Sequence, residues 1–255
     1  MKKRAARVRL PCQDGRFEME VTDDGSRTLF NRLSGVSYHS SSGAVSETRL
    51  VYLLNSGVYE RLVHRRATRV LEIGLGTGMG MFLTVDHAIN HGTPLNYVAV
   101  EYDWLAAGVV QDLAPDSWVS DPALVASYLQ WRSAAVPSGM LGRDHVNDEL
   151  PQVFQWAAGN DQFVEVHCGD AHKWRYEGEK FDAIYFDPFA PDTNSGLWQS
   201  PMLEVMYKLM NKHGRFVTYC VKREVRDRLT AVGFKVAKIR GPQGGKREVL
   251  VATKM

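Results

Sequence analysis

Residues 70–78 read Val-Leu-Glu-Ile-Gly-Leu-Gly-Thr-Gly, so an apolar run leads directly into alternating glycines. The apolar residues predict a buried strand, and the residues after the last glycine predict a helix. Gly74, Gly76 and Gly78 let the backbone come close to a ligand at the carboxyl end of this strand, where open α/β sheets bind nucleotides. The segment therefore predicts a nucleotide-binding turn between a strand and a helix.

The spacing of these glycines discriminates between nucleotide ligands. A dinucleotide fingerprint needs G-x-G-x-x-G, but Met79 or Met81 stands where its third glycine would fall. A phosphate loop needs Gly-Lys before Ser or Thr, whereas the one Gly-Lys pair, ending at Lys246, precedes Arg247. What remains is Glu72-x-Gly-x-Gly-x-Gly, the pattern associated with S-adenosylmethionine, whose carboxylate can face the helix N-terminus. We therefore expect S-adenosylmethionine as the cofactor, with Glu72 and the three glycines at its site.

From Arg69 onward, β-rich runs alternate with candidate helices, which predicts a parallel sheet with helices on both faces. Only a Gly/Pro turn, residues 241–245, separates the last two runs, so these form an antiparallel hairpin at the sheet edge. Such a hairpin separates methyltransferase sheets from dinucleotide-binding ones. The expected fold class is therefore α/β, with a Rossmann-like class I methyltransferase sheet. Its strands are expected at residues 70–73, 97–101, 163–168, 183–187, 215–221, 235–239 and 248–252.

The clearest helix signal begins at Ser200 as N-cap, with Pro201 in the first turn, and ends at Gly214. Residues 1–68 and a segment at about residues 115–160 fall outside the alternation of strands and helices. The second segment is too long for a bare loop, so one or two helices are expected in it. We therefore expect a methyltransferase domain over residues 69–255 that carries this helical insert. Residues 1–68 would be an N-terminal extension contributing to the pocket.

Length, charge and cysteine content restrict the class of protein. A chain of 255 residues suits one well-buried domain with an insert. Its three cysteines form no CxxC pair, so neither a zinc site nor a redox dithiol of that kind is expected, and no metal is predicted. No apolar run approaches the ~20 residues of a membrane span, and no apolar stretch follows the basic start as in a secretory signal. A soluble, cytoplasmic protein without a membrane partner is the expectation.

The formal net charge is only +2, so the whole molecule offers no strong field for a nucleic acid. Any such partner must be met by a local basic patch. One candidate patch is the start of the chain, where a frayed, solvated terminus is the other interpretation. The basic residues there are Lys2, Lys3, Arg4, Arg7 and Arg9.

Acidic residues end the next two predicted strands. Glu101 ends the second strand, where a carboxylate can accept hydrogen bonds from both hydroxyls of a ribose. Gly169 and Asp170 follow the third strand, and an aspartate at that edge can accept from an adenine amino group. A surface acid and a turn aspartate are the alternatives for these two carboxylates. We expect Glu101, Gly169 and Asp170 to bind the cofactor.

The fourth strand ends in Asp187-Pro-Phe-Ala-Pro191, and Trp198 follows after a polar loop. Methyl transfer is an in-line displacement that needs a neutral nucleophile held close, so proximity contributes most and a base need handle only one proton. An amine is mostly protonated at neutral pH, and a nearby carboxylate can orient it and receive its proton. Asp187 is therefore the predicted catalytic residue. A proline-rich turn that only ends the strand is the alternative.

Further segments carry a family resemblance over most of the chain. They are Asp24-Gly-Ser26, Tyr38-His39-Ser40, Gly43-Ala44, Glu47, the glycine turn, Phe186-Asp187, Phe189-Ala190-Pro191, Trp198, Val217-Thr218-Tyr219-Cys220, Lys222, Gly241-Pro242 and Lys246-Arg247-Glu248. With them the chain resembles the MnmC/MnmD type of methyltransferase, which completes the 5-methylaminomethyl group on the wobble uridine of tRNA. The glycine turn is generic, whereas the Tyr-His-Ser and Gly-Lys-Arg-Glu segments are specific to this family.

The resemblance implies S-adenosylmethionine as cofactor and 5-aminomethyluridine, often 2-thiolated, as methyl acceptor. It also implies that Tyr38 and Glu47 line the cofactor and substrate pocket. The partner would be a tRNA, bound at its anticodon loop. Substrate contacts are expected from stacking on the displaced uridine and from local positive charge. The residues expected to make them are Phe189, Pro191, Trp198, Lys246 and Arg247.

Some relatives in this family carry a flavin oxidoreductase domain after the methyltransferase. The chain ends at Met255 without one, so we expect other enzymes to supply the aminomethyl precursor. Pro188 stands where the family more often has Gly or Ala, and the loop at residues 192–196 lacks the usual Lys and Pro. Two alternatives stay open. One is a methyltransferase acting on another amine or on a nucleobase, since residues 187–190 resemble a D-P-P-Y motif; the other is a non-catalytic tRNA-binding protein on the same scaffold.

Overall fold

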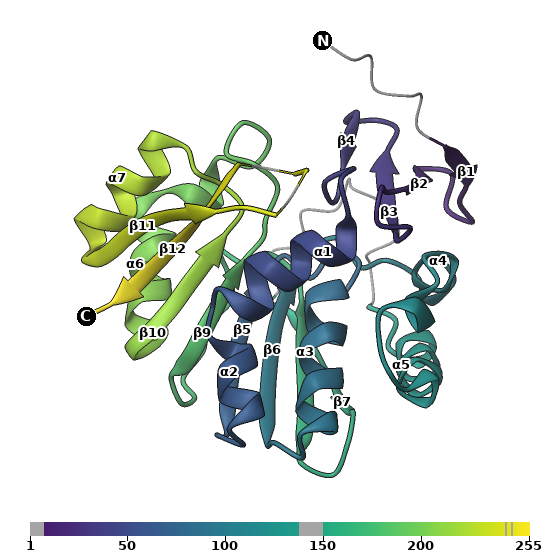
Figure 1. Ribbon diagram of the computed structural model, residues 1–255, viewed down its shortest axis with the longest axis horizontal. Coiled ribbons are helices and arrows are strands. Elements are labelled where there is room, and N and C mark those ends of the chain that lie inside the picture. Colours follow the sequence, from purple (N-terminus) through teal and green to yellow (C-terminus); the bar gives the residue numbers. More distant parts are fainter. Residues whose placement is uncertain (1–7, 138–149, 243, 246) are drawn as a thin grey trace.

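A computed structural model describes residues 8–137, 150–242, 244–245 and 247–255 of the chain (Figure 1). Within these residues an eight-stranded sheet forms the centre, in the order β11-β12-β10-β9-β5-β6-β8-β7. Its strands are β5 (Thr68–Ile73), β6 (Leu95–Glu101), β7 (Gln152–Ala157), β8 (Gln162–Cys168), β9 (Phe181–Phe186), β10 (Met210–Thr218), β11 (Phe234–Arg240) and β12 (Glu248–Lys254).

The neighbouring strands β10, β9, β5, β6 and β8 run parallel, whereas β12 pairs antiparallel with both β10 and β11. The predicted C-terminal hairpin is therefore confirmed, and so is the Rossmann-like α/β class. The central strand β5 is apolar on both faces because both faces are covered. Val70 belongs to the core on one side and Leu71 to the core on the other, and neither is exposed.

Two groups of helices cover the two faces of the sheet (Figure 1). One core includes side chains of α1 (Ala44–Thr48), the π-helix η1 (Arg49–Leu54), α2 (Val58–Val63), α3 (Met79–Asn90), α4 (Ala107–Asp112) and α5 (Pro122–Ala134). The other core includes side chains of η3 (Gly196–Trp198), α6 (Ser200–Leu209) and α7 (Arg223–Val232). A short 3-10 helix, η2 (Pro115–Ser117), precedes α5. No helix in the described part of the chain is long and apolar enough to cross a membrane.

The first residues form a separate antiparallel sheet, β1 (Arg9–Pro11), β2 (Phe17–Val21), β3 (Arg27–Asn31) and β4 (Val36–Ser37). Phe17 and Leu29 of this sheet are buried in the same core as α3. Asp112, at the end of α4, accepts hydrogen bonds from the backbone and side chain of Gln13. The small sheet is thus fastened to the main domain near α4 (Figure 1), although no strand was predicted for it.

Two predicted elements differ from the structure. The helix expected from Ser200 to Gly214 ends at Leu209, and its N-cap is Gln199, which makes no side-chain capping bond. Met210 instead begins β10, because it is fully buried and pairs with Phe181 of β9. The apolar pattern of the sequence placed Met210 in the core, but a buried methionine fits the last turn of a helix as well as the start of a strand.

The segment expected to be helical, at about residues 115–160, contains α5 but also the strand β7. β7 pairs antiparallel with β8 from Gln152 to Ala157, and this pairing covers the edge of the main sheet. Phe154 and Trp156 of β7 pack in the core shared with α5. The aromatic and β-branched side chains of residues 153–156 favour a strand, whereas the prediction of helices was based on the length of the segment.

Candidate cofactor and substrate site

The residues predicted for the site lie at the carboxyl edge of the sheet, because three strands continue their ladders one residue into the following turn. Gly74 N donates to Val100 O at 2.9 Å, Gly169 N to Glu101 O at 2.8 Å, and Asp187 N to Ile73 O at 2.9 Å. The turns after β5, β8 and β9 and the end of β6 are thereby held beside one another. Parallel pairing is what brings these distant segments to one edge.

The glycine turn needs glycine for both conformation and space. Gly74, Gly76 and Gly78 have φ values of 88°, 52° and 79°, in the left-handed region that favours glycine. A Cβ on Gly74 would lie 2.9 Å from the carbonyl oxygen of Asp187, and one on Gly76 would lie 3.2 Å from Cδ1 of Tyr38. The bare backbone of this turn therefore faces Asp187 on one side and Tyr38 on the other.

Glu101 links β6 to the glycine turn. Its side chain is 8% exposed. Its Oε2 accepts from Gly76 N at 2.7 Å, and its Oε1 accepts from Asp103 N at 2.7 Å. Burial raises the pKa of this carboxyl, while the two backbone N–H groups act in the opposite direction. Each oxygen retains a second lone pair, so the carboxylate can still accept from two ribose hydroxyls.

Glu72 lies beneath the turn, inside the core. Tyr97 donates to its Oε2 at 2.8 Å, and its Oε1 lies 2.7 Å from the place where a Cβ on Gly80 would stand. Burial raises the pKa of this carboxyl well above its usual range. The sequence predicted Glu72 at the cofactor, whereas the structure places its carboxyl against Tyr97 and the first turn of α3.

Asp170 shapes the turn after β8. Its Oδ1 accepts from His172 N at 2.9 Å, and its carbonyl oxygen accepts from Lys173 N and Trp174 N. Gly169, in the preceding position, leaves space for Pro151, whose Cα would lie 2.9 Å from a Cβ there. Asp170 is half-buried at the same edge of the sheet as Glu101. Its role in forming the turn is therefore compatible with the predicted position at the cofactor.

Asp187 is held by a residue that the sequence analysis missed. The hydroxyl of Tyr52, in the π-helix η1, donates to Asp187 Oδ1. Burial and then the charge of Asp187 raise the pKa of Tyr52 well above its usual value, so this phenol stays a donor. The partners are 135 positions apart, and Tyr52 lies in an otherwise apolar segment. No local signal connects them.

Glu47 adds a second carboxylate on this side of the site. It is 6% exposed, its Oε2 accepts from Ser40 N at 2.6 Å, and its Oε1 has no hydrogen-bond partner among the described residues. After burial, the charges of Asp187 and Glu47 both contribute to the raised pKa values of Tyr52 and Tyr219. Glu47 and Asp187 therefore act on the same two phenols. A buried oxygen without a donor marks a place where a ligand or water can donate.

Aromatic rings from the N-terminal segment and the loop after β9 meet at the turn. The rings of Tyr38 and Phe189 are 5.3 Å apart at an angle of 78°, and both side chains are half-buried. Tyr219 donates to the carbonyl oxygen of Pro188 at 2.9 Å. Tyr102, directly after Glu101, is 55% exposed and was not predicted for the site. Tyr38 and Phe189 thus form one wall beside the glycine turn.

Trp198 does not face the site, which corrects the prediction that it stacks on the substrate. Its side chain is fully buried and packs on Phe186, with ring centroids 5.0 Å apart. Its Nε1 donates to the carbonyl oxygen of Phe189 at 2.9 Å. Trp198 therefore supports Phe189 from the core. Pro191 is also buried, Arg247 is exposed, and Lys246 lies outside the described residues.

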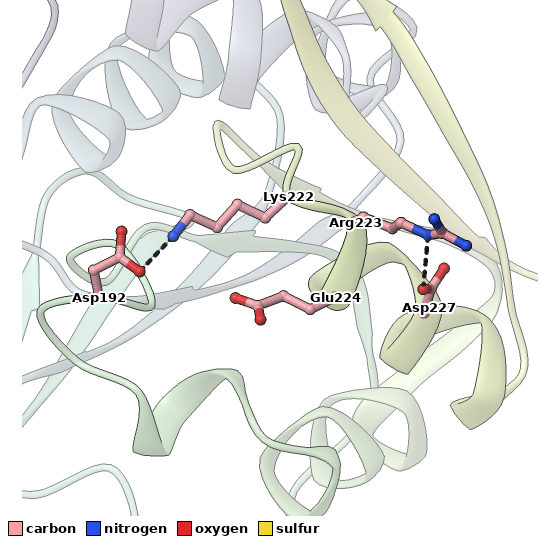
Figure 2. A pocket seen from close by; sticks show the side chains of 5 residues that line it. All are labelled: Asp192, Lys222, Arg223, Glu224 and Asp227. Carbon is pink, nitrogen blue, oxygen red and sulfur yellow. Dashed lines mark hydrogen bonds and ion pairs between the residues drawn. The ribbon is translucent and has the colours of Figure 1, made fainter.

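An open depression of about 540 Å³ lies between the loop after β9 and the start of α7, and charged side chains line it (Figure 2). Lys222 Nζ pairs with Asp192 Oδ1 at 2.5 Å, which joins the loop after β9 to the start of α7. Arg223 pairs with Asp227 at 3.6 Å, and Glu224 completes the lining. None of the residues predicted for the cofactor lines it, so the depression is distinct from the cofactor site.

The predicted basic start of the chain is only partly described. Arg9 forms ion pairs with Glu18 and Glu20, at 3.4 and 3.0 Å, so its charge is offset within the small sheet. The other basic residues of that cluster, at positions 2–7, lie outside the described residues. Arg247 is exposed near the tip of the β11–β12 hairpin, and Gly244 of the same tip accepts a hydrogen bond from Ser42 Oγ of the N-terminal segment.

Comparisons with known proteins show which proteins the chain is similar to. Residues 144–255 match a family model described as S-adenosyl-L-methionine-dependent methyltransferase. The tRNA 5-methylaminomethyl-2-thiouridine biosynthesis bifunctional protein MnmC of Burkholderia mallei is 27% identical over 244 residues, and that of Burkholderia thailandensis is 28% identical over 236 residues. Each alignment covers 90% of this chain and 34% of the relative, so the chain spans about a third of their length.

The crystal structure of MnmC2 from Aquifex aeolicus is similar over nearly the whole chain. It has a TM-score of 0.70 and 25% sequence identity, and the match covers 94% of this chain and 71% of that one. The match includes the part of the chain that the family model leaves out. With the glycine turn and the edge hairpin, these likenesses make the chain similar, over nearly its whole length, to S-adenosylmethionine-dependent methyltransferases of the MnmC type.

Proposed function

We propose that the chain methylates the amine of 5-aminomethyluridine, often 2-thiolated, at the wobble position of a tRNA, to give the 5-methylaminomethyl product. The observation that carries this proposal is the Asp187 carboxylate, bonded to Tyr52 and next to the glycine turn. The similarity to the tRNA 5-methylaminomethyl-2-thiouridine biosynthesis proteins MnmC supports this substrate. A tRNA substrate would also place the reaction in the cytoplasm.

The residues at the carboxyl edge fit S-adenosylmethionine. Gly74 and Gly76 pack closely against the Asp187 backbone and the Tyr38 ring, which gathers these groups around the turn, and Glu101 has acceptor capacity for ribose hydroxyls. We assign the methionyl carboxylate to the glycine turn and the N-terminus of α3, and the adenine amino group to Asp170. When bound, the cofactor supplies an electrophilic methyl group. Glu72 would support the turn from below.

Asp187 would orient the substrate ammonium and accept one proton from it. The freed nitrogen lone pair would form the new N–C bond while the methyl–sulfur bond breaks, so that its electron pair stays on the sulfur of S-adenosylhomocysteine, and the proton would stay on the carboxylate. The Tyr52 hydroxyl fixes Asp187 Oδ1 and so sets the direction in which the carboxylate faces. Holding the amine in line with the methyl group supplies the larger part of the acceleration.

The N-terminal segment would complete the pocket. We propose that Tyr38 and Glu47 line it, so that residues 1–68 act as a pocket-forming extension of a methyltransferase domain at residues 69–255. Phe189, beside Tyr38, would stack on the displaced uridine, which is worth about 1–3 kcal/mol in other single-strand binders. Pro191 and the buried Trp198 would hold Phe189 in place, while Lys246 and Arg247 would contact phosphates of the anticodon loop.

A methyl-incorporation assay tests the substrate. It combines the protein, labelled S-adenosylmethionine and tRNA from cells arrested at the 5-aminomethyl stage, with fully modified tRNA as the control. Label is expected in the wobble uridine of the arrested tRNA alone. Label in DNA, or in a free small amine, would contradict the tRNA substrate while leaving the methyltransferase class intact.

Replacing Asp187 tests the catalytic assignment in the same assay. Asp187→Asn keeps the shape and removes the charge, so the rate should fall roughly 100-fold or more while cofactor affinity is retained. Asp192→Asn is the matched control, because Asp192 belongs to the same loop but pairs with Lys222 on the outside. Near-normal turnover of Asp187→Asn at pH 7 would show that Asp187 is not the base.

A further inference from the structure

A buried arginine of the insert lies behind the cofactor site. Arg132, near the end of α5, is 1% exposed. Its Nε donates to the carbonyl oxygen of Leu105 at 2.7 Å, and its Nη1 donates to the hydroxyl of Tyr128. Its Nη2 has no hydrogen-bond partner among the described residues. A buried guanidinium is costly to desolvate unless an anion or acceptors compensate it, so its burial here requires a physical reason.

Arg132 holds the turn that follows the ribose carboxylate. Glu101 begins this turn and Leu105 ends it, so the bond to the Leu105 carbonyl closes its far end. The guanidinium also lies 3.7 Å from the ring centroid of Trp104, a cation–π contact inside the same turn. Asp103 N meanwhile donates to Glu101 at the near end. The near end of the turn is thus fixed by the hydrogen bond to the Glu101 side chain, and its far end by the hydrogen bond from Arg132 of α5.

The same arginine is connected to the glycine turn through Tyr128. The hydroxyl of Tyr128 lies 3.6 Å from the position of a Cβ on Gly78. Phe82, one turn into α3, packs edge-to-face on Tyr128 with ring centroids 4.6 Å apart. Arg132 is therefore linked to both structures that frame Glu101, directly to the loop after β6 and through Tyr128 to the turn after β5.

The charges around Glu101 come from several elements. Burial raises the pKa of Glu101, Asp103 raises it further, and the positive charge of Arg132 lowers it. Cys168, at the end of the neighbouring β8, is a neutral thiol because burial and Glu101 raise its pKa to about 12. Glu72 of β5 also interacts with Glu101. Among the described residues, Arg132 is the cation whose charge lowers the pKa of this carboxyl, less strongly than the two backbone N–H groups do.

We propose that Arg132 is a positioning residue for the cofactor: it holds the turn from Glu101 to Leu105 and keeps the Glu101 carboxylate charged for the ribose hydroxyls. The insert would thereby serve cofactor binding in addition to covering the sheet edge. This role depends on the cofactor alone. Failure of the tRNA assignment would leave it untouched.

Calorimetric titration with S-adenosylmethionine between pH 6.0 and 8.5 tests the proposal without tRNA. In Arg132→Met the carboxyl loses its cation and takes up a proton at higher pH, and a protonated acid is a poorer acceptor. The affinity of this variant should fall more steeply than that of the wild type as pH drops from 8.5 to 6.0. Arg132→Lys retains the charge and should restore the wild-type pH profile, even if its overall affinity is lower.

Parallel pH profiles for Arg132→Met and the wild type would overturn the proposal, because a merely structural arginine lowers affinity equally at every pH. Introducing Glu101→Gln into both backgrounds should remove the difference between their profiles, and a difference that persists would also overturn it. If Arg132→Met does not fold, Arg132→Gln replaces it, since glutamine keeps a donor for Leu105 while removing the charge. Thermal unfolding without cofactor verifies that each variant is native.

Discussion

At the scale of single residues, burial has different consequences for Glu101, Glu47 and Glu72. Glu101 receives two backbone N–H donors and remains at the sheet edge, where it can serve a ligand. Glu47 receives one donor on Oε2 and keeps its Oε1 without a partner among the described residues. Among the described residues, only the Tyr97 hydroxyl donates to Glu72, which lies in the core. A buried carboxyl with so little compensation favours its neutral form.

Replacing Glu72 with Gln should change how stability depends on pH. The pKa of Glu72 in the folded state is raised above its unfolded value, so its contribution is complete below the unfolded pKa and is lost as pH rises toward the folded pKa. Wild-type stability should therefore decline relative to Glu72→Gln above about pH 4.3, by up to about 1.4 kcal/mol per pH unit. Urea unfolding of both proteins at several pH values measures the difference. A constant difference across that range would contradict the buried, neutral state of Glu72.

At the scale of elements, we propose that the cofactor approaches the backbone at the turn between β5 and α3. Gly76 and Gly92 have similar φ values, 52° and 59°, on either side of α3. A Cβ on Gly92 would meet nothing within 4 Å, whereas one on Gly76 would lie 3.2 Å from Tyr38. The two glycines therefore share backbone strain and differ in what surrounds them.

Gly76→Ala and Gly92→Ala form a matched pair of variants. Both should lose about 1 kcal/mol of stability or somewhat more, because alanine resists the left-handed conformation. Only Gly76→Ala should also lose affinity for S-adenosylmethionine, since its methyl group pushes against Tyr38 while Gly76 N is bonded to Glu101. Chemical denaturation and calorimetry separate the two effects. Equal cofactor affinity in both variants would show that the cofactor does not approach this turn.

At the scale of the whole molecule, the proposed tRNA substrate is a polyanion, whereas the net charge of the chain is only +2. Several cations are already engaged within the protein: Arg9 pairs with Glu20, and Arg223 pairs with Asp227. The hairpin that carries Arg247 meets the N-terminal segment, where Ser42 Oγ donates to Gly244 O at 2.5 Å. Positive charge at this tip therefore lies next to the segment proposed to line the pocket.

Replacing Lys246 and Arg247 with Ala should weaken tRNA binding and reduce its salt dependence. For each phosphate that is no longer neutralised, the slope of log affinity against log salt becomes shallower by about 0.7–0.9. Arg223→Ala is the control, because the charge of Arg223 is already partnered by Asp227, and it should change the slope less. Filter binding between low and moderate salt measures both slopes. Unchanged salt dependence in the double variant would remove the hairpin tip from the tRNA surface.

The sequence by itself determined the strand, glycine turn and helix at the start of the sheet, the edge hairpin, and the positions of Glu101 and Asp187 at strand ends. Each of these depends on local pattern: glycine spacing, strand periodicity, or a turn too short for a crossover. The small N-terminal sheet and β7 escaped prediction, although residues 153–156 carry strand composition. These strands form because they pair with other segments of the chain, and this pairing cannot be recognised from their own residues alone.

Only the tertiary structure decided which side chains meet. It brought Tyr52 to Asp187 across 135 positions and placed Arg132 behind Glu101. It also turned Trp198 into the core, where its N–H holds the Phe189 carbonyl. An aromatic or charged residue has the same local signal in a pocket wall as in a core. The packing of neighbouring elements decides between these two places. It brings together residues that are far apart in the sequence, so no short stretch of sequence can show the result.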